Sequence, residues 1–530
     1  MSSITKDYRA IAAQKAIEQR SKIPKAWLIP PGTTKDVTNV MHIPNTCGIL
    51  NDLECDLTSN YDATALLPKL KDGTFSVEQV TVAFCKRAAI AHQLVNCLTE
   101  MFFNKAIERA RELDAKRRAN PKEPLPPLFG LPISLKDTFQ VVGEDASAGL
   151  ACYVDEPAEE NSTLVSLLLD IGAVLYCKTN IPQMLMTADS DNNVFGRTLN
   201  PRNSHLTAGG STGGEGALLA LRGSILGVGT DIGGSIRIPA LCNGLYGFKP
   251  SADLIPQGSG RDLRVPGTVG VLPSTGPLAT SVRDCSLFLK AIFQAGTWKY
   301  DSKAISLPWV NLKARERLRI GIVENDGVFT PSPPVRRGLG IAADRIRQKS
   351  DVEIIHLKLP NVKEHYKDLF SYLSLSGCDP VVPSLEAIGL LSIPAKSLQS
   401  FFDLNVRRGE AVNSYLKLFR DNDLDAILMP PAPHTTMPLD TWPTATYTGL
   451  WNYLDYPAIT IPVDQVRQED VVDDLSNAKF GEEDVKVYGL YTGPESYKDA
   501  PVCVQLVGYR HADEALVNTA AILDRAINGD

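Results

Sequence analysis

The chain has 530 residues, with 54 lysines and arginines against 61 aspartates and glutamates, and a formal net charge of −7. Hydrophobic residues make up 44% of the sequence and charged residues 22%, which is the balance of a soluble globular protein. The mild acidity argues against a nucleic-acid partner, because such binding depends on clustered lysine and arginine. The sequence also lacks the run of about 18 apolar residues that a membrane-spanning helix needs.

The two ends of the sequence carry no recognisable address. Residues 1–22 mix charged and small side chains without the apolar core of a signal peptide, and the final RAINGD matches no retention or peroxisomal signal. We therefore expect a cytoplasmic protein. Ten cysteines without a C-x-x-C pair and seven histidines without paired ligand spacing predict no metal site. The cysteines are expected to be small core residues.

The first 125 residues have the spacing of helices, with apolar positions recurring every three or four residues in 77–98 and 105–119. Four prolines within 120–127 end this region. Between about 128 and 290 the pattern changes to short apolar runs, which predict buried strands at 131–135, 173–177 and 224–229 and a helix at 162–172.

From about residue 317 strands and helices alternate again, which predicts an α/β fold. The expected strands lie at 318–324, 351–357, 425–431, 458–463 and 502–508, and the expected helices at 335–349, 397–419 and 512–527. The segment 465–500 is polar and contains seven acids in QEDVVDDLSNAKFGEED, so it is predicted to be a surface loop.

Two glycine clusters mark candidate chemistry, because glycine is costly in ordered structure unless the backbone needs close approach. The first, 208–216, contains G-x-S-x-G centred on Ser211, which on its own suggests the nucleophile elbow of an α/β-hydrolase. An elbow needs an apolar strand directly before the serine, but the preceding NPRNSHLTA is polar. An esterase with Ser211 as nucleophile and a histidine base stays as an alternative.

The second cluster, 227–239, follows the apolar run SILGV. Its consecutive N–H groups before Ser235 could point into one cavity and form an oxyanion hole, and the plain alternative is a glycine turn. A serine needs a base, and Lys136 at the end of LPISLKD is a candidate because burial favours the neutral amine. A lysine at a strand end is otherwise a solvated residue.

The segments GLPISLKD (130–137), GGSTGGEGA (209–217) and GVGTDIGGSIRIP (227–239) together resemble the amidase signature family, in order and in spacing. Further likeness to the fungal acetamidase branch covers nearly the whole chain, in AFCKRAAIAHQLVNCLTEMFF, KTNIPQ, FGRTLNPRN and WKYDSK. Thr212 departs from the usual G-G-S-S-G-G, in which a second serine stands at this position. A threonine keeps the hydroxyl but adds a methyl group beside the site.

The resemblance implies that Ser235 is the nucleophile, Ser211 the proton-relaying bridge after a cis Gly210-Ser211 bond, and Lys136 the general base and later acid. The implied oxyanion donors are the N–H groups of Ile232, Gly233, Gly234 and Ser235. The residues expected to line the acyl pocket are Met184, Leu185 and Met186, with Trp451 and Tyr453 as weaker candidates. Asp231 and Arg237 are expected to brace the nucleophile loop rather than to touch substrate.

The fold implied is one large α/β/α domain with a mixed central sheet. Residues 1–75 are expected to form a helical extension that wraps the domain at 76–530, whose core signature spans 130–250. The function implied is hydrolysis of a small aliphatic amide such as acetamide, through an acyl-enzyme on Ser235 and without a metal or cofactor. The expected partner is the small-molecule amide, and the oligomeric state stays open between a monomer and a homodimer.

Three further alternatives stay open from the sequence. A tailoring amidase that acts on a larger natural-product amide would carry the same motifs. The glutaminase subunit of a tRNA-dependent amidotransferase shares the signature, but the acetamidase features argue against it. A family member retained as a non-catalytic binding protein would be expected to have lost at least one of Lys136, Ser211 and Ser235, and all three are present.

Overall fold

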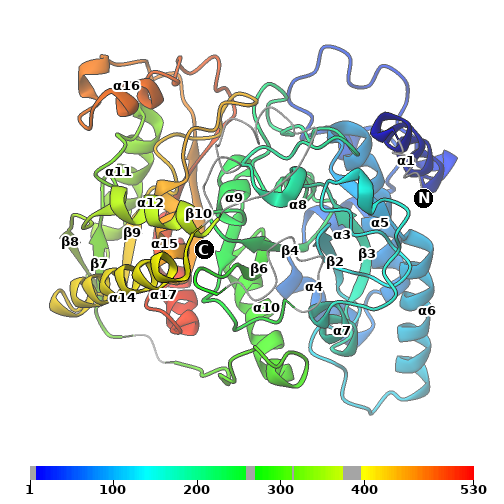
Figure 1. Ribbon diagram of the computed structural model, residues 1–530. Helices are drawn as coiled ribbons and strands as arrows, with labels where there is room; N and C mark the ends of the chain where they lie inside the picture. The colour runs from blue at the N-terminus through cyan, green and yellow to red at the C-terminus, as the bar shows by residue number, and fades with distance from the viewer. Residues whose placement is uncertain (1–6, 258–268, 313–314, 374–395, 530) are drawn as a thin grey trace.

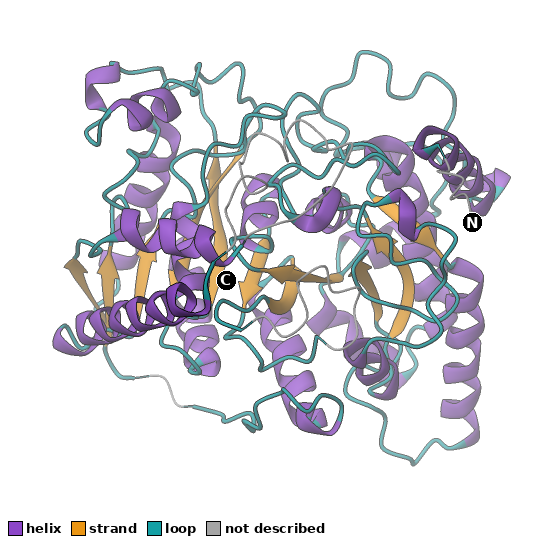
Figure 2. Ribbon diagram, viewed as in Figure 1, coloured by secondary structure: helices purple, strands orange, loops and turns teal. Residues whose placement is uncertain are grey.

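The computed structural model describes residues 7–257, 269–312, 315–373 and 396–529. A mixed sheet of eleven strands runs across the molecule, and helices pack on both of its faces (Figures 1 and 2). In order across the sheet the strands are β1 (Leu98–Met101), β3 (Val174–Thr179), β2 (Pro132–Lys136), β4 (Leu226–Asp231), β6 (Ser274–Ala279), β5 (Tyr246–Lys249), β10 (Ala458–Gln465), β11 (Pro501–Val507), β9 (Ala426–Met429), β7 (Leu318–Ile322) and β8 (Val352–His356). The predicted α/β class with a mixed sheet is confirmed.

The α-helices surround this sheet. In chain order they are α1 (Tyr8–Lys22), α2 (Ile43–Thr46), α3 (Asp52–Ser59), α4 (Ala63–Asp72), α5 (Val77–Val95), α6 (Phe103–Ala119), α7 (Thr163–Asp170), α8 (Gly213–Ala220), α9 (Arg237–Asn243), α10 (Val282–Ala295), α11 (Pro333–Arg347), α12 (Val362–Tyr372), α14 (Leu398–Asp421), α15 (Thr446–Tyr453), α16 (Glu482–Tyr488) and α17 (Asp513–Asn528). Among the helices of the described ranges, none combines the length and apolar character needed to cross a bilayer.

Three neighbouring parallel strands, β3, β2 and β4, include two of the motifs found in the sequence. The motif 130–137 contains β2, and the motif 227–239 begins in β4. β2 pairs in parallel with β3 on one side and with β4 on the other. All five residues of β2 are buried, as the apolar run predicted. Lys136 ends β2 and Asp231 ends β4, so these two side chains lie at the same edge of the sheet, where parallel strands present their carboxyl ends.

The region expected to be helical contains a strand. The sequence predicts a helix that continues to residue 98, but α5 ends at Val95 because Asn96 adopts a left-handed φ of 54°. The chain then enters β1, whose four residues are all buried and pair antiparallel with β3. β5 and β6 were also not predicted, because their sequences, YGFK and STGPLA, carry glycine or proline that weakens a strand pattern.

The segment 465–500 is more ordered than the expected surface loop. It contains the short 3₁₀ helix η6 (Leu475–Asn477) and the helix α16. The buried carboxylate of Asp484 accepts the backbone N–H groups of Thr330 at 2.6 Å, Lys479 at 2.9 Å and Phe480 at 3.0 Å. One of its acids therefore organises backbone from another part of the chain instead of facing water.

The cysteines are free thiols throughout the described ranges. Those that are buried, as expected, are Cys85, Cys97, Cys177, Cys242, Cys285 and Cys503. Cys152 is exposed, so the expectation of a core residue is wrong there, and Cys47 and Cys55 are half-buried. Cys378 lies outside the described residues.

The N-terminal helix α1 is joined to the edge of the sheet by buried polar contacts. Gln19 Nε2 donates to the carbonyl oxygens of Leu98 and Thr99 in β1, at 3.0 and 2.9 Å. Lys15 Nζ lies 2.7 Å from Glu100 Oε1 and 2.9 Å from Asp145 Oδ2, and its side chain is only 4% exposed. A charged lysine at this depth is tolerated because two carboxylates surround it.

Replacing Lys15 by alanine is expected to lower the free energy of unfolding by about 3 kcal/mol, because the buried carboxylates would lose a cationic partner. Chemical denaturation followed by tryptophan fluorescence measures this loss. Arg20→Ala, at an exposed position of the same helix, is the matched control and is expected to change stability by less than about 0.5 kcal/mol. Equal losses in the two variants would contradict the assignment.

Candidate active site

The side chain of Lys136 lies at the centre of the candidate site. It is 0% exposed at the end of β2. Its Nζ lies 2.7 Å from Ser211 Oγ, 2.9 Å from Thr230 Oγ1 and 3.3 Å from the Thr230 carbonyl oxygen. The structure therefore brings Lys136 and Ser211 into direct contact, as the resemblance implied.

Burial lowers the pKa of Lys136 to about 7, although the negative charges of Asp231 and Glu215 act in the opposite direction. The free amine is then a substantial fraction at neutral pH. A neutral amine has two hydrogens to donate and one lone pair. With the hydrogens directed to Thr230, the lone pair can accept the hydroxyl proton of Ser211.

Ser211 is held by a tightly packed loop. The peptide bond between Gly210 and Ser211 is cis, as the resemblance implied. A Cβ at Gly210 would lie 2.3 Å from the carbonyl oxygen of Thr187, so only glycine fits against this neighbouring backbone. Ser190 Oγ closes the loop by donating to the Gly209 carbonyl at 2.8 Å and accepting the Gly213 N–H at 3.0 Å.

The loop between β4 and α9 carries Ser235, whose side chain is half-buried. The Asp231 carboxylate organises this loop by accepting the N–H groups of Gly234 at 2.8 Å and Ile236 at 3.1 Å. Arg237 binds both carboxylate oxygens, with Nε and Nη2 each at 3.0 Å. Although burial acts to raise the pKa of Asp231, the Arg237 guanidinium holds it well below its usual range. Asp231 and Arg237 therefore brace the loop, as expected.

The contacts of Asp231 leave fewer backbone N–H groups free to act as the expected oxyanion donors. The Gly234 N–H already donates to Asp231, so it is engaged within the protein. A Cβ at Gly233 would meet no atom within 4 Å, which shows open space beside the loop at this residue. The backbone around Gly233 is accordingly the accessible part of the glycine loop.

Two residues of α15 contact the loop between β4 and α9 that carries Ser235, and sequence reasoning missed both. Thr448 Oγ1 donates to the Gly233 carbonyl at 2.7 Å. Asn452 Nδ2 donates to the carbonyl oxygen of Asp231 at 3.0 Å and to its Oδ1 at 2.9 Å. Both side chains come from a segment that lies more than 200 positions further along the chain, and no local motif marks them.

Thr212 is accommodated by a glycine on the neighbouring strand. A Cβ at Gly229 of β4 would lie 2.7 Å from Thr212 Cγ2, so the methyl group occupies the space that Gly229 leaves open. Thr212 Oγ1 lies 3.5 Å from the Thr230 carbonyl oxygen, at the limit of a hydrogen bond. The departure from the usual serine thus adds packing next to Lys136 without displacing it.

The expected pocket residues lie on a loop beside Ser211. Met184 and Leu185 belong to the 3₁₀ turn η3 (Gln183–Leu185) and have left-handed φ values of 58° and 64°. Met184 is 8% exposed, whereas Leu185 and Met186 are half-buried. This loop continues into Thr187, which packs against Gly210. The position of this loop next to Gly210 is compatible with a role in lining the acyl pocket. That role stays a prediction.

Trp451 and Tyr453, the weaker pocket candidates, lie in a buried aromatic cluster. The ring of Trp451 packs edge-on against Tyr415 at 5.8 Å, and the ring of Tyr453 stacks on His365 at 5.7 Å. Both residues belong to α15 and are fully buried, so their rings anchor this helix in the aromatic cluster.

The geometry around Ser211 does not match a nucleophile elbow. No strand leads directly into Ser211, whose backbone lies in an irregular segment before α8. Its bonded neighbour is the Lys136 amine rather than a histidine. His434, a candidate base for the esterase alternative, directs Nδ1 to the adjacent Thr435 carbonyl at 2.8 Å and packs against Trp442.

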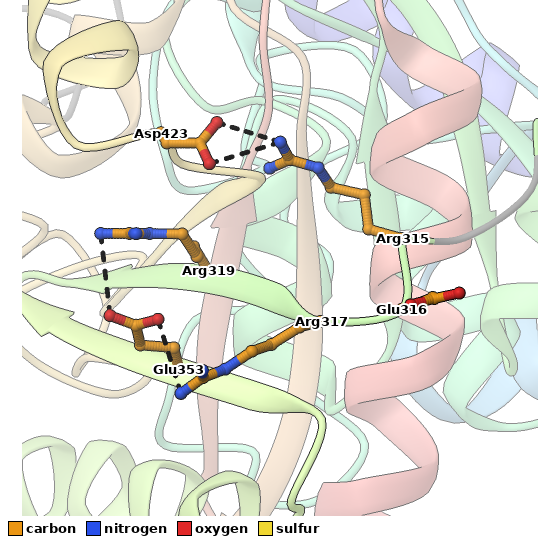
Figure 3. Close-up of a pocket in the computed structure, with 6 residues that line it drawn as sticks. All are labelled: Arg315, Glu316, Arg317, Arg319, Glu353 and Asp423. Carbon is orange, nitrogen blue, oxygen red and sulfur yellow. Dashed lines mark hydrogen bonds and ion pairs between the residues drawn. The ribbon is translucent and has the colours of Figure 1, made fainter.

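A second group of charged side chains surrounds a shallow hollow beside β7 (Figure 3). Arg315 lies 3.0 Å from Asp423, while Arg317 and Arg319 both face Glu353 at 3.6 and 3.7 Å. β7 is separated from β4 by β6, β5, β10, β11 and β9. Since each arginine has a carboxylate partner, this hollow is a surface ion-pair network distinct from the candidate site.

Over the ranges that the structure describes, no group of three or more histidine, cysteine, aspartate and glutamate side chains is arranged to hold a metal ion. The polar groups around Lys136 are the hydroxyls of Ser211 and Thr230 and the carboxyl groups of Asp231 and Glu215.

Comparison with known proteins agrees with the sequence motifs and the fold. The amidase family profile matches residues 79–380 and 395–517. The chain is 35% identical to an amidase of Gibberella moniliformis and 34% identical to an acetamidase of Aspergillus oryzae, and each alignment covers 98% of both chains. It is also similar to the solved structure of a fatty acid amide hydrolase, with a TM-score of 0.91 and 28% identity over 99% of this chain and 96% of that one.

The chain therefore belongs to the amidase family, and it is a hydrolase that acts on amides. The resemblance to the amidase signature family and its fungal acetamidase branch is confirmed.

Gly233 and Gly234, in the loop that carries Ser235, are expected to respond differently to substitution by alanine. Gly234 has a φ of 131°, and a Cβ there would lie 2.4 Å from Thr448 Oγ1, so Gly234→Ala is expected to cost about 2 kcal/mol in the free energy of unfolding. Gly233→Ala is the matched control, expected to cost less than about 0.5 kcal/mol because its Cβ enters open space. Chemical denaturation of both variants measures the difference, and a larger cost for Gly233→Ala would contradict the packing.

Proposed function

We propose that this enzyme hydrolyses a small aliphatic amide, such as acetamide, to a carboxylate and ammonia through Ser235, Ser211 and Lys136. The acetamidases of Aspergillus oryzae and Emericella nidulans, 34% and 35% identical to this chain, support the substrate class. The observation that carries the mechanism is the fully buried Lys136 amine in contact with Ser211. The expected cytoplasmic location stays a prediction.

In the proposed reaction, Lys136 accepts the hydroxyl proton of Ser211, and Ser211 takes the proton of Ser235. The Ser235 Oγ then attacks the amide carbonyl carbon and forms a tetrahedral intermediate. Backbone N–H groups of the glycine loop would stabilise the negative oxygen, with those of Ile232 and Gly233 as the leading candidates because the Gly234 N–H is engaged by Asp231.

Amides need protonation of the leaving nitrogen, and the same relay provides it. Lys136, now an ammonium group, returns its proton through Ser211 to the nitrogen, the carbon–nitrogen bond breaks, and ammonia leaves an acyl-enzyme on Ser235. A water molecule that gives its proton to the relay then attacks the ester carbonyl. The carboxylate is released, and the Ser235 hydroxyl is restored.

A fluorophosphonate probe tests the nucleophile directly. We expect mass spectrometry to find the label on Ser235, and labelling to be lost or slowed at least about 100-fold in Lys136→Ala, because the relay would lack its base. His511→Ala is the control and is expected to label like the wild type. Label on Ser211, or labelling that depends on His511 or His434, would instead support the esterase alternative.

The pH dependence tests the role of Lys136. The relay needs the neutral amine, and the pKa of Lys136 is lowered by burial to about 7. Below this pH the ammonium form predominates, so kcat/KM for acetamide is expected to rise with pH through an acid limb near 7. Measuring kcat/KM between about pH 5 and 10 checks this. A limb near 10 would show that burial does not neutralise the lysine.

A further inference from the structure

Glu215, the third residue of α8, is a second buried ionisable group near Lys136, and the proposed reaction makes no use of it. Its side chain is 0% exposed, and its carboxyl group lies over the three parallel strands β3, β2 and β4. Thr179 Oγ1 of β3 donates to Oε1 at 3.0 Å, and Ser134 Oγ of β2 lies 2.6 Å from Oε2. A Cβ at Gly227 of β4 would lie 2.2 Å from Oε2, so this glycine leaves the room that the carboxyl group fills.

The partners of this carboxyl group are hydroxyls. Ser134 and Lys136, two residues apart on β2, both face the α8 region, but no ion pair joins Lys136 to Glu215. An ionised carboxylate buried without a cationic partner is far costlier than the neutral acid. The surroundings of Glu215 thus favour a bound proton.

A count of hydrogens points the same way. Three contacts follow one another: Glu215 Oε2 to Ser134 Oγ at 2.6 Å, Ser134 Oγ to Ser224 Oγ at 2.8 Å, and Ser224 Oγ to the Leu226 carbonyl at 3.1 Å. Each hydroxyl supplies one hydrogen, and the carbonyl supplies none. Three hydrogen bonds in series therefore need a third hydrogen, and a protonated Glu215 can supply it.

We propose that Glu215 is a neutral carboxylic acid in the active enzyme and acts as a positioning residue, holding its own proton so that no carboxylate stabilises the ammonium form of Lys136. The inference rests on the proposed Ser235, Ser211 and Lys136 relay. Burial raises the pKa of Glu215 to about 8, although the Ser134 and Thr179 hydroxyls act to lower it. The acid form is then the larger fraction at neutral pH.

The other ionisable groups around Glu215 keep one charge state in the working range. Asp231 of β4 is ionised and paired with Arg237 of α9. Burial raises the pKa values of the Cys97 thiol, which lies between α5 and β1, and of the Tyr176 phenol and the Cys177 thiol of β3, so all three are neutral near pH 7 to 8. Among these neighbours, Lys136 and Glu215 are the two that titrate there.

This pair gives the pH profile two limbs of different origin. Protonation of Lys136 below about pH 7 removes the base. Ionisation of Glu215 above about pH 8 adds a negative charge close to Lys136. This charge raises the free energy of the tetrahedral intermediate, whose oxygen is also negative. We therefore expect kcat/KM to fall again at alkaline pH.

The main test is Glu215→Gln, because the glutamine amide cannot ionise but can donate to Ser134 as the acid does. We expect kcat/KM for acetamide at pH 7.5 to stay within about threefold of the wild type, the acid limb to remain, and the alkaline limb to disappear. The matched control is Asp284→Asn, which neutralises another buried carboxyl group on α10 and should leave both limbs in place.

Infrared difference spectroscopy of the wild type minus Glu215→Gln at pH 7 reports the proton without using activity. The carbonyl stretch of a protonated carboxylic acid is expected, and carboxylate bands in its place would overturn the proposal. An alkaline limb that persists in Glu215→Gln, or a loss of activity beyond about 100-fold in this variant, would overturn it as well. If the fluorophosphonate failed to label Ser235, the proposed relay would fall, while the infrared result would still decide whether Glu215 carries a proton.

Discussion

The removal of the Lys136 amine from water is the constraint on which the whole site depends. A solvated lysine has a pKa near 10.4 and is an ammonium ion at neutral pH, unable to accept a proton. The fold places this side chain at the end of a strand buried between two parallel neighbours and surrounds Nζ with the hydroxyls of Ser211 and Thr230. Hydroxyl partners satisfy a neutral amine without stabilising its charged form, as a carboxylate in direct contact would.

The two carboxyl groups near Lys136, those of Asp231 and Glu215, add little negative charge at the amine, for two different reasons. Asp231 is ionised, but the bidentate contact with Arg237 offsets its charge, and its carboxylate also accepts the backbone N–H groups of Gly234 and Ile236 and the side-chain amide of Asn452. Glu215 is bonded to the hydroxyls of Ser134 and Thr179 and lies over Gly227, where a Cβ would collide with its carboxyl group. The geometry of the Ser235 loop and the basicity of the Lys136 amine are therefore linked, because the buried Asp231–Arg237 pair that shapes this loop also limits the negative field at the lysine.

Much of this arrangement was predictable from local sequence. The apolar runs indicated β2, β3 and β4, and the structure joins Lys136 to Ser211 as the family resemblance implied, whereas the role of Ser235 stays a prediction. Thr448 and Asn452 were not predictable, since their contacts join positions more than 200 residues apart and depend on how α15 packs. Glu215 stood inside a recognised motif, but its environment comes from three strands and could be known only from the fold.

The contacts of α1 have a consequence for attempts to shorten this protein. Lys15 binds Asp145, whose carbonyl oxygen accepts Lys178 Nζ, and Lys178 in turn lies 3.3 Å from Asp137, the residue that follows Lys136. The first helix is thus connected by a series of buried polar contacts to the strand end that carries the amine. A shorter chain, trimmed to the part that bears the signature motifs, would keep every residue of the proposed relay. It would lose the contacts from α1 that help to fix the position of Lys136.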